Sequence, residues 1–185
     1  MISALLLAAL VTQATAYRID PATCEAGFDL KATGHTVHGS TKSVTGEVRV
    51  VPEGADALTL SGTIAIGAAS LATGNDRRDA TMHSKTLVVS SFPTIDFQPA
   101  RFTPSGPAAA SGTVTGVLSG RLTIRGQTKS QTMTVTLTPE GDRIVASGTF
   151  DVAWLEFGVP DPSFFVVRVE KIAHAHFNAT FVPVP

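Results

Sequence analysis

Alternation of apolar and polar residues with a period of two is the strongest constraint on how this chain can fold. In residues 120–125 Leu122 and Ile124 alternate with polar side chains, and in residues 128–138 three apolar residues alternate with threonine. Successive side chains of a strand point to opposite faces, so each segment would have one apolar and one polar face. The turn at Gly126-Gln127 between the two segments predicts a β-hairpin.

Strand patterns recur along most of the chain. Short segments rich in Pro and Gly at 52–54, 104–107 and 139–142 separate several of them and predict turns. Many short strands with polar turns favour an antiparallel barrel or sandwich, and closure into a barrel removes exposed edges. We therefore predict an all-β fold, with further strands at 25–32, 43–51, 59–66, 94–103, 112–118, 143–152 and 166–181.

The composition narrows the class of protein further. The 185 residues carry a formal net charge of -1, and 43% of them are hydrophobic while 16% are charged. A neutral chain lacks the basic face that binds phosphate backbones, so we expect no nucleic-acid partner. This hydrophobic content supports a packed core, and the length fits one domain.

The N-terminal residues predict export. An uncharged apolar run at 2–11 precedes Ala14-Thr15-Ala16, which matches a signal-peptidase site with cleavage before Tyr17. We therefore divide the chain into a signal peptide, 1–16, and a single mature domain, 17–185. The rest of the sequence contains no long apolar run, so we expect no transmembrane anchor after cleavage and a periplasmic or secreted protein.

The segment 75–84 departs from the strand pattern. It is the most charged stretch of the chain and predicts a short helix capped by Thr73 or Asn75. Two interpretations are open. Its charges form an ordinary solvated helix surface, or Asn75, Arg78 and His83 lie at a barrel mouth and hydrogen-bond the polar end of a ligand.

The sequence gives little support for a catalytic site or for a metal site. The chain has no G-x-S-x-G elbow and no glycine-rich phosphate loop. His174 and His176 would lie on the same face of a strand, where two imidazoles can reach one ion, but that face is the solvent side and a third ligand such as Glu170 or His35 is needed. We therefore expect no metal site, no cofactor and no catalytic residue. A hydrolase using His83 or the His174/His176 pair is the competing hypothesis.

Five motifs occur in order along the chain: YRIDPA at 17–22, GF at 27–28, TGNDRRD at 73–79, FPTIDF at 92–97 and GRLTIRGQTK at 120–129. Together they resemble the YceI-like family, which comprises bacterial and mostly periplasmic polyisoprenoid-binding proteins. The resemblance extends from Tyr17 to about Phe181. It implies an extended, lipocalin-like antiparallel barrel of about eight strands, with one or two short helices, whose lumen holds a long isoprenoid chain. It also favours a role at the mouth for Asn75, Arg78 and Asp79.

A barrel of this size would have an apolar interior. An eight-stranded barrel is filled by side chains or holds one small ligand. Small residues at expected inward positions, namely Gly62, Ala68, Ala173, Ala175 and Ala179, leave room for a ligand. The residues predicted to line the lumen are Phe28, Leu30, Ile64, Ile66, Phe97, Leu122, Ile124, Phe150 and Phe177, and those predicted at a polar mouth are Asn75, Arg78, Asp79 and His83.

These observations predict a non-enzymatic protein that binds, sequesters or transports a polyisoprenoid, an isoprenoid quinone or a similar amphipathic lipid. Burial of an apolar chain in such a lumen needs no catalytic group. An interaction module of the cell envelope with a dry core is the third hypothesis. A second copy of the chain, in a homodimer, is a further possible partner.

Overall fold

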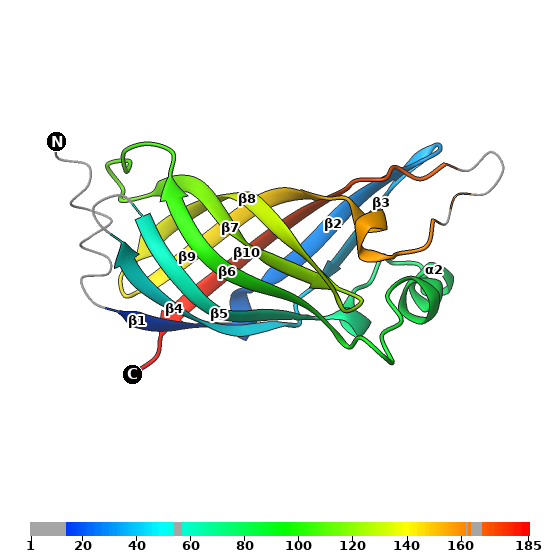
Figure 1. Cartoon of the computed structure of the whole chain (residues 1–185), viewed down its shortest axis with the longest axis horizontal. Helices are drawn as coiled ribbons and strands as arrows, with labels where there is room; N and C mark the ends of the chain where they lie inside the picture. The colour runs from blue at the N-terminus through cyan, green and yellow to red at the C-terminus, as the bar shows by residue number, and fades with distance from the viewer. Residues whose placement is uncertain (1–13, 54–56, 162, 164–167) are drawn as a thin grey trace.

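The strands of the chain form one antiparallel sheet that closes on itself (Figure 1). The computed structural model describes residues 14–53, 57–161, 163 and 168–185. The strands are β1 (Thr15–Ile19), β2 (Glu25–Ala32), β3 (His35–Thr41), β4 (Val44–Glu53), β5 (Ala57–Gly67), β6 (Thr94–Pro104), β7 (Val114–Ile124), β8 (Gln127–Glu140), β9 (Arg143–Val152) and β10 (Ala173–Pro183). The short helical segments are η1 (Pro21–Thr23), η2 (Ala68–Ser70), α2 (Asp76–Thr81), η3 (Met82–Thr86) and η4 (Trp154–Phe157).

The ten strands of the described residues make a barrel of eight. β10 pairs with β9 along one edge, and along the other it pairs first with β2 and then with β1, so β1 and β2 are two parts of one interrupted strand. β3 and β4 are likewise two parts of one interrupted strand, because β3 pairs with β2 and β4 pairs with β1. Pairing of β1 with both β4 and β10 closes the ring. The predicted antiparallel barrel of about eight strands is confirmed.

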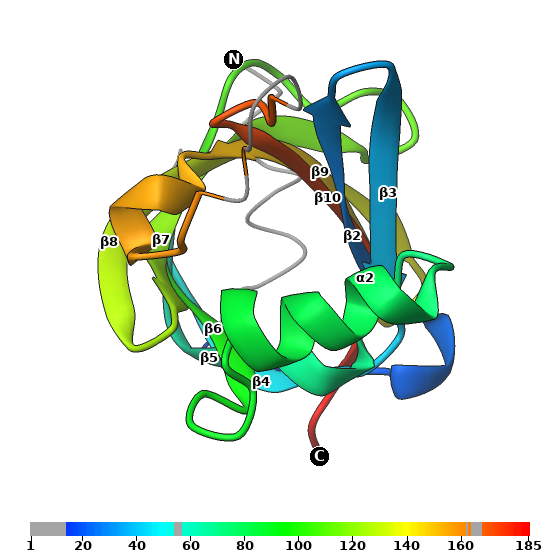
Figure 2. The same cartoon turned by 90° about the vertical axis from the view of Figure 1, so that its right-hand side faces the viewer.

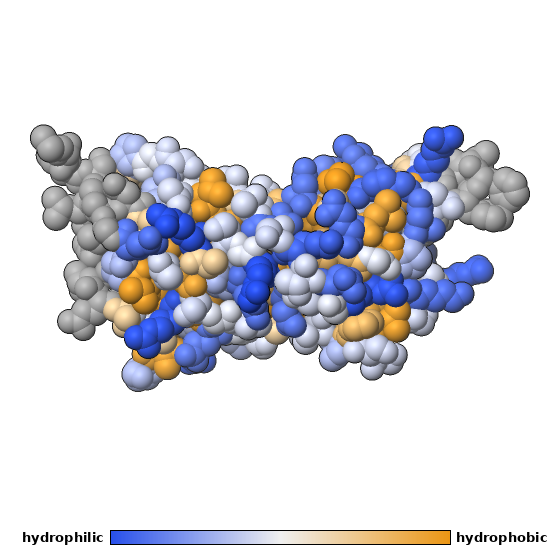
Figure 3. Space-filling model, viewed as in Figure 1, coloured by the Kyte–Doolittle hydropathy of each residue, from blue (hydrophilic) through white to orange (hydrophobic). Residues whose placement is uncertain are grey.

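The alternating patterns place the apolar side chains inside the barrel. In β7, Val114, Leu122 and Ile124 are buried at even positions. The predicted hairpin forms, with its turn one residue earlier than expected, at Arg125-Gly126. Both turn residues have positive φ, 51° and 73°, which matches the twist of a two-residue hairpin. The polar faces of the strands lie outside, and the face in Figure 3 mixes hydrophilic and hydrophobic residues.

Several predicted boundaries need correction. Segments 112–118 and 120–125 are one strand, β7, and the strand expected over 166–181 begins at Ala173, with 166 and 167 outside the described residues. β3 was not predicted because His, Thr and Ser dominate its sequence. Pro52 and Glu53 of the turn expected at 52–54 belong to β4, and Gly54 lies outside the described residues.

The predicted signal peptide overlaps the barrel. Residues 1–13 lie outside the described part of the chain, but Thr15 and Ala16 belong to β1 and pair with Val50 and Arg49. The expected cleavage before Tyr17 would therefore cut inside β1. Processing at this position remains a prediction.

The charged segment forms the expected short helix at one end of the barrel. Asn75 is its N-cap, and the Asn75 side-chain oxygen accepts a hydrogen bond from the backbone N–H of Arg78 at 3.0 Å. The π-helical turn η3 continues α2. Figure 2 shows that α2 crosses the opening of the ring. Backbone hydrogen bonds at 3.0 Å between Ser40 of β3 and Ala72 connect the segment before α2 to the barrel.

Four phenylalanine rings lie against glycines on the inner wall of the barrel. Phe177 is the cross-strand partner of Gly148, and a Cβ built on Gly148 would lie 2.6 Å from the Phe177 ring. Gly120 leaves the same kind of space for Phe97, whose ring lies 2.6 Å from the corresponding position. The other two pairs are Phe28 with Gly39 and Phe102 with Gly116. A glycine opposite each ring lets the ring lie along the wall, as in other aromatic–glycine pairs of sheets.

This packing predicts that Gly148→Ala destabilises the barrel. The new methyl group would meet the Phe177 ring at 2.6 Å and the Thr134 carbonyl oxygen at 2.7 Å, and the carbonyl belongs to the backbone of β8 and cannot move freely. Overpacking of this kind costs about 1–3 kcal/mol. Thermal unfolding followed by circular dichroism should show a Tm lower by roughly 2–12 °C, since 1 kcal/mol shifts Tm by about 2–4 °C at this size.

Gly106→Ala is the matched control for this prediction. No atom lies within 4 Å of a Cβ built on Gly106, so its substitution should leave Tm nearly unchanged. Equal Tm values for the two variants would show that the glycine opposite Phe177 is not required.

Candidate functional site

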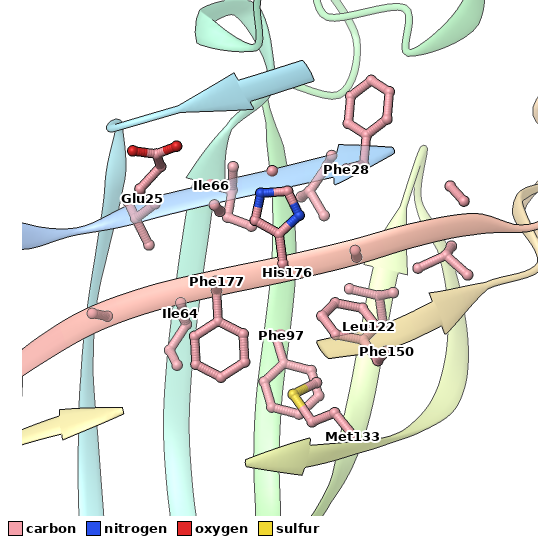
Figure 4. Close-up of a pocket in the computed structure, with 18 of the residues that line it drawn as sticks. Glu25, Phe28, Ile64, Ile66, Phe97, Leu122, Met133, Phe150, His176 and Phe177 are labelled. Carbon is pink, nitrogen blue, oxygen red and sulfur yellow. The ribbon is translucent and has the colours of Figure 1, made fainter. Parts of the chain in front are cut away.

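The barrel encloses a long apolar cavity of about 740 Å³. This volume lies within the range of about 300–1,000 Å³ that is typical of small-molecule sites. In Figure 4, the rings of Phe97, Phe150 and Phe177 border the same space, with Met133 beside Phe97. All nine residues predicted in the lumen line the cavity, namely Phe28, Leu30, Ile64, Ile66, Phe97, Leu122, Ile124, Phe150 and Phe177.

The space inside the barrel comes from small side chains as well as from the Phe–Gly pairs. Ala173, Ala175 and Ala179 of β10 line the cavity, as predicted from their small size. Gly62 and Ala68 do not line it, which corrects the expectation for these two residues. Gly62 instead allows a close approach of β4, because its φ is 127° and a Cβ would overlap the Glu47 carbonyl oxygen.

The two ends of the cavity differ. Toward the end opposite α2 the wall is apolar and includes Phe102 and Val135, each 1% exposed. At the α2 end the lining residues Asn75, Arg77 and Thr81 are exposed to solvent. Exposed lining residues also occur at Glu25 and His176 on the wall formed by β2 and β10.

Two of the four predicted mouth residues line the cavity. They are Asn75 and Arg78. Asp79 and His83 do not line it, and both hold the segment in place instead. His83 Nε2 lies 2.8 Å from the Leu71 carbonyl oxygen, and the Asp79 carboxylate accepts hydrogen bonds from the backbone N–H of Thr73 at 3.0 and 3.1 Å. These contacts leave neither residue directed into the cavity.

A small cluster around Thr73 fixes the position of α2. The Thr73 hydroxyl donates to Asp79 and accepts from Arg78 Nε at 2.7 Å, while an Arg78 guanidinium nitrogen donates to the Thr73 carbonyl oxygen at 2.9 Å. The hydroxyl of Thr73 is the main cause that holds the pKa of Asp79 below its usual value, and the charges of Arg78 and His83 add to it against a smaller desolvation effect. Arg78 is therefore a structural residue as much as a lining residue.

Sequence reasoning missed Arg77. This residue lines the cavity next to Arg78, and its guanidinium has no hydrogen-bond or ion-pair partner among the described residues. Two adjacent arginines look equivalent in the sequence. The contacts with Thr73 distinguish Arg78 from Arg77, whose guanidinium has no such contact with the part of the chain that the structure describes.

His174 of β10 lies on the outer face of the barrel, as the spacing predicted, whereas the exposed His176 also borders the cavity. His174 Nδ1 is 2.7 Å from Asp151 Oδ1, and His174 Nε2 is 3.7 Å from Glu170 Oε2. His176 points away from Phe177 in Figure 4 and lies over Gly27. Over the residues that the structure describes, no three His, Cys, Asp or Glu side chains are arranged to hold a metal ion.

The part of the chain that the structure describes contains no helix that is long and apolar enough to span a bilayer.

Comparisons with known proteins agree with this architecture. Two solved structures superpose with a TM-score of 0.71: BcnA of Burkholderia cenocepacia, at 18% identity over 88% of this chain and 98% of that chain, and a polyisoprenoid-binding domain from Saccharophagus degradans, at 13% identity over 92% and 99%. A YceI protein of Campylobacter jejuni superposes with a TM-score of 0.55 at 15% identity, over 80% of this chain and 85% of that chain. At these identities the likeness shows the fold.

A search of curated proteins found no significant match. The model of the YceI-like domain, however, matches residues 17–181, which is nearly the whole chain. The resemblance seen in the five sequence motifs is thereby confirmed, and the chain belongs to the YceI-like family.

Proposed function

We propose that this protein binds a polyisoprenoid or a similar amphipathic lipid, such as an isoprenoid quinone, and carries or sequesters it in the barrel cavity. The observation that carries the proposal is the cavity itself, which apolar side chains of the barrel strands line along its length and polar side chains of one segment line at one end. An elongated lipid with a small polar head group has the matching distribution of polarity. The polyisoprenoid-binding domain of Saccharophagus degradans, which has the same fold, supports this choice of ligand.

Burial of the lipid chain supplies the free energy of binding. Each Å² of apolar surface removed from water contributes about 25 cal/mol, or roughly 0.8 kcal/mol for each CH₂ group. The ligand loses conformational freedom in the cavity, so only part of this gain appears as affinity. Because the preformed wall keeps its aromatic rings against glycines, little reorganisation of the protein offsets the remainder.

A carrier of this kind would act in an aqueous compartment outside the cytoplasm. The apolar run at 2–11 and the A-x-A site before Tyr17 support export to the periplasm or the medium. We propose a binding protein rather than an enzyme, since the cavity needs no reactive group to hold a lipid. Neither His83, which lies against the Leu71 carbonyl oxygen, nor His174, which pairs with Asp151, lines the cavity.

The proposal predicts that the purified protein retains lipid. Full-length protein expressed in bacteria and purified without detergent should give, on organic extraction and mass spectrometry, a prenyl lipid in an amount comparable with that of the protein. An extract without any lipid, from protein whose circular dichroism confirms the barrel, would count against the proposal.

A bulky side chain inside the cavity should abolish this retention. Ala175 lines the cavity between its cross-strand partners Phe28 and Phe150, so Ala175→Trp would fill space that the lipid needs. We expect the amount of extracted lipid to fall at least about tenfold, because loss of only two buried CH₂ contacts already costs roughly 1.6 kcal/mol. Ile64→Trp tests the same wall from β5 if the first variant does not fold.

Asn178→Trp is the matched control for the blocking variants. Asn178 lies on β10, as Ala175 does, but it is exposed on the outer face and does not line the cavity. This variant should retain lipid. Normal retention in folded Ala175→Trp and Ile64→Trp would place the ligand elsewhere.

A further inference from the structure

The segment that crosses the opening of the barrel is hydrogen-bonded almost entirely to itself. We call this segment, residues 71–92 with α2 and η3, the flap (Figure 2). Among the described residues, every hydrogen bond and ion pair of residues 73–92 has its partner within the flap. The cluster around Thr73 and the contact of His83 with the Leu71 carbonyl oxygen connect its parts. The flap is therefore a unit of its own and not part of the sheet.

The two ends of the flap are attached at one place. The last residue of β5 pairs with the first residue of β6, and next to this pair the backbone N–H of Ala68 donates to the Pro93 carbonyl oxygen at 2.9 Å. The hydroxyl groups of Ser70 and Thr41, 2.6 Å apart, tie η2 to the end of β3. Since the chain leaves the sheet and returns to it at the same point, changes of a few backbone dihedral angles there would turn the whole flap.

Beyond this hinge, one pair of residues connects the flap to β3. Ser40 and Ala72 exchange two backbone hydrogen bonds, each 3.0 Å long. Water replaces such hydrogen bonds when they break, so their net contribution to stability is small. The cavity is lined by Val37 on the β3 side of this pair and by Leu71 and Thr73 on the flap side. Separation of the pair would therefore open the cavity to solvent beside β3.

The wall of the described barrel is harder to open at any other strand. The shortest ladder between two of its strands, β1 with β10, has three register pairs. The edge of β3 that faces the flap has the single pair of Ser40 with Ala72. A lipid that passed between two other strands would have to break a longer row of backbone hydrogen bonds. The gap between β3 and the flap is thus the weakest seam of the wall.

The flap also contains strained backbone near its C-terminal attachment. η3 is a π-helical turn, and Val88, which follows it, has a φ of 52°. A β-branched residue is rarely found in the left-handed region, and π-helical turns are also rare, yet both recur at functional sites. The Val88 carbonyl oxygen accepts from the backbone N–H groups of Ser91 and Phe92, at 2.9 and 3.0 Å. A backbone rotation here would both turn the flap and relieve the strain.

We propose that the flap opens by separation of Ala72 from Ser40 and turns about its attachment between β5 and β6, so that the lipid enters and leaves the cavity beside β3. This inference rests on the proposed function and adds the route that the ligand takes. Met82 and Leu87 of the flap line the cavity and would cover the lipid when the flap is closed. Opening exposes these apolar side chains to water, which favours the return to the closed position.

A crosslink across the pair tests this route. Ser40 and Ala72 are exposed, and partners that exchange both hydrogen bonds have Cα atoms about 5.5 Å apart, a separation that a disulfide spans. Ser40→Cys/Ala72→Cys is made together with Cys24→Ala, which removes the one natural thiol. A short bifunctional thiol reagent joins the two residues if the disulfide does not form.

The single tryptophan of the chain provides the measurement. Trp154 is buried and lines the cavity, so its fluorescence should respond when a lipid enters. Full-length protein freed of lipid is mixed with polyprenol in phosphatidylcholine vesicles. We expect the crosslinked protein to take up the lipid at least about tenfold more slowly than the same protein after reduction, which corresponds to about 1.4 kcal/mol of activation free energy. The final fluorescence should be the same, because the crosslink blocks the route and not the cavity.

Thr115→Cys/Thr136→Cys is the matched control for the crosslink. These residues are cross-strand partners of β7 and β8, their hydroxyl groups are 3.0 Å apart, and neither lines the cavity. Their crosslink joins two strands that are already paired, so uptake should be equally fast in the oxidised and the reduced protein. Equal slowing by the two crosslinks would indicate a general stiffening of the barrel and overturn the role of the flap.

Ala72→Pro should have the opposite effect. Proline lacks the N–H that donates to the Ser40 carbonyl oxygen, and Leu71 already has the extended conformation that a residue before proline adopts, with φ −63° and ψ 124°. Loss of one hydrogen bond should speed uptake by about two- to tenfold. Unchanged or slower uptake by folded Ala72→Pro would contradict the proposed opening.

The remaining outcomes separate this inference from the proposed function. Equal rates of uptake before and after reduction, in protein whose crosslink is verified by mass spectrometry, would overturn the inference and leave lipid binding intact. A lower final fluorescence change in the crosslinked protein would also overturn it, because the crosslink would then act on the binding site itself. No fluorescence response of the wild-type protein would contradict both, since the flap would have no lipid to admit.

Discussion

The cavity depends on the way aromatic rings pack against glycines on the inner wall of the barrel. A ring that points to the centre of an eight-stranded barrel would fill it, since such barrels are only just wide enough for their own side chains. Phe97 and Phe177 instead lie flat where Gly120 and Gly148 leave the wall bare. The rings still exclude water from the strands behind them. The barrel thus remains packed along its wall and open along its axis.

The open end follows from the interrupted strands. β1 and β2 share the edge of β10, and β2 and β3 continue beyond the point where β1 and β4 close the ring. β3 therefore has β2 as its strand partner on one side, and on the other a single bridge from Ser40 to Ala72. The segment with α2 starts from this bridge and crosses the opening. Its polar groups are acceptable there because they reach solvent, whereas the same groups deeper in the barrel would remain unpaired.

Sequence patterns predicted the wall better than the mouth. Alternation located β2 and β9 to the residue and identified the lumen positions, because one apolar face is a strong and regular signal. It missed β3, whose inward positions include Gly39 and Thr41 rather than large apolar residues. Alternation also did not reveal the Phe–Gly pairs, because the two members of a pair, such as Phe177 and Gly148, lie on different strands. Such pairs depend on the register between two neighbouring strands, and a single sequence does not give that register.

The fold and the selectivity for a ligand depend on different kinds of interaction. Apolar burial is proportional to area and has no direction, so many different sets of Val, Leu, Ile and Phe build an equivalent lumen. Solved barrels at 13–18% identity can therefore share this fold with little sequence in common. A lumen of this kind distinguishes chain length and bulk but not charge. Discrimination between head groups must come from directional contacts, which a wall of apolar side chains does not offer.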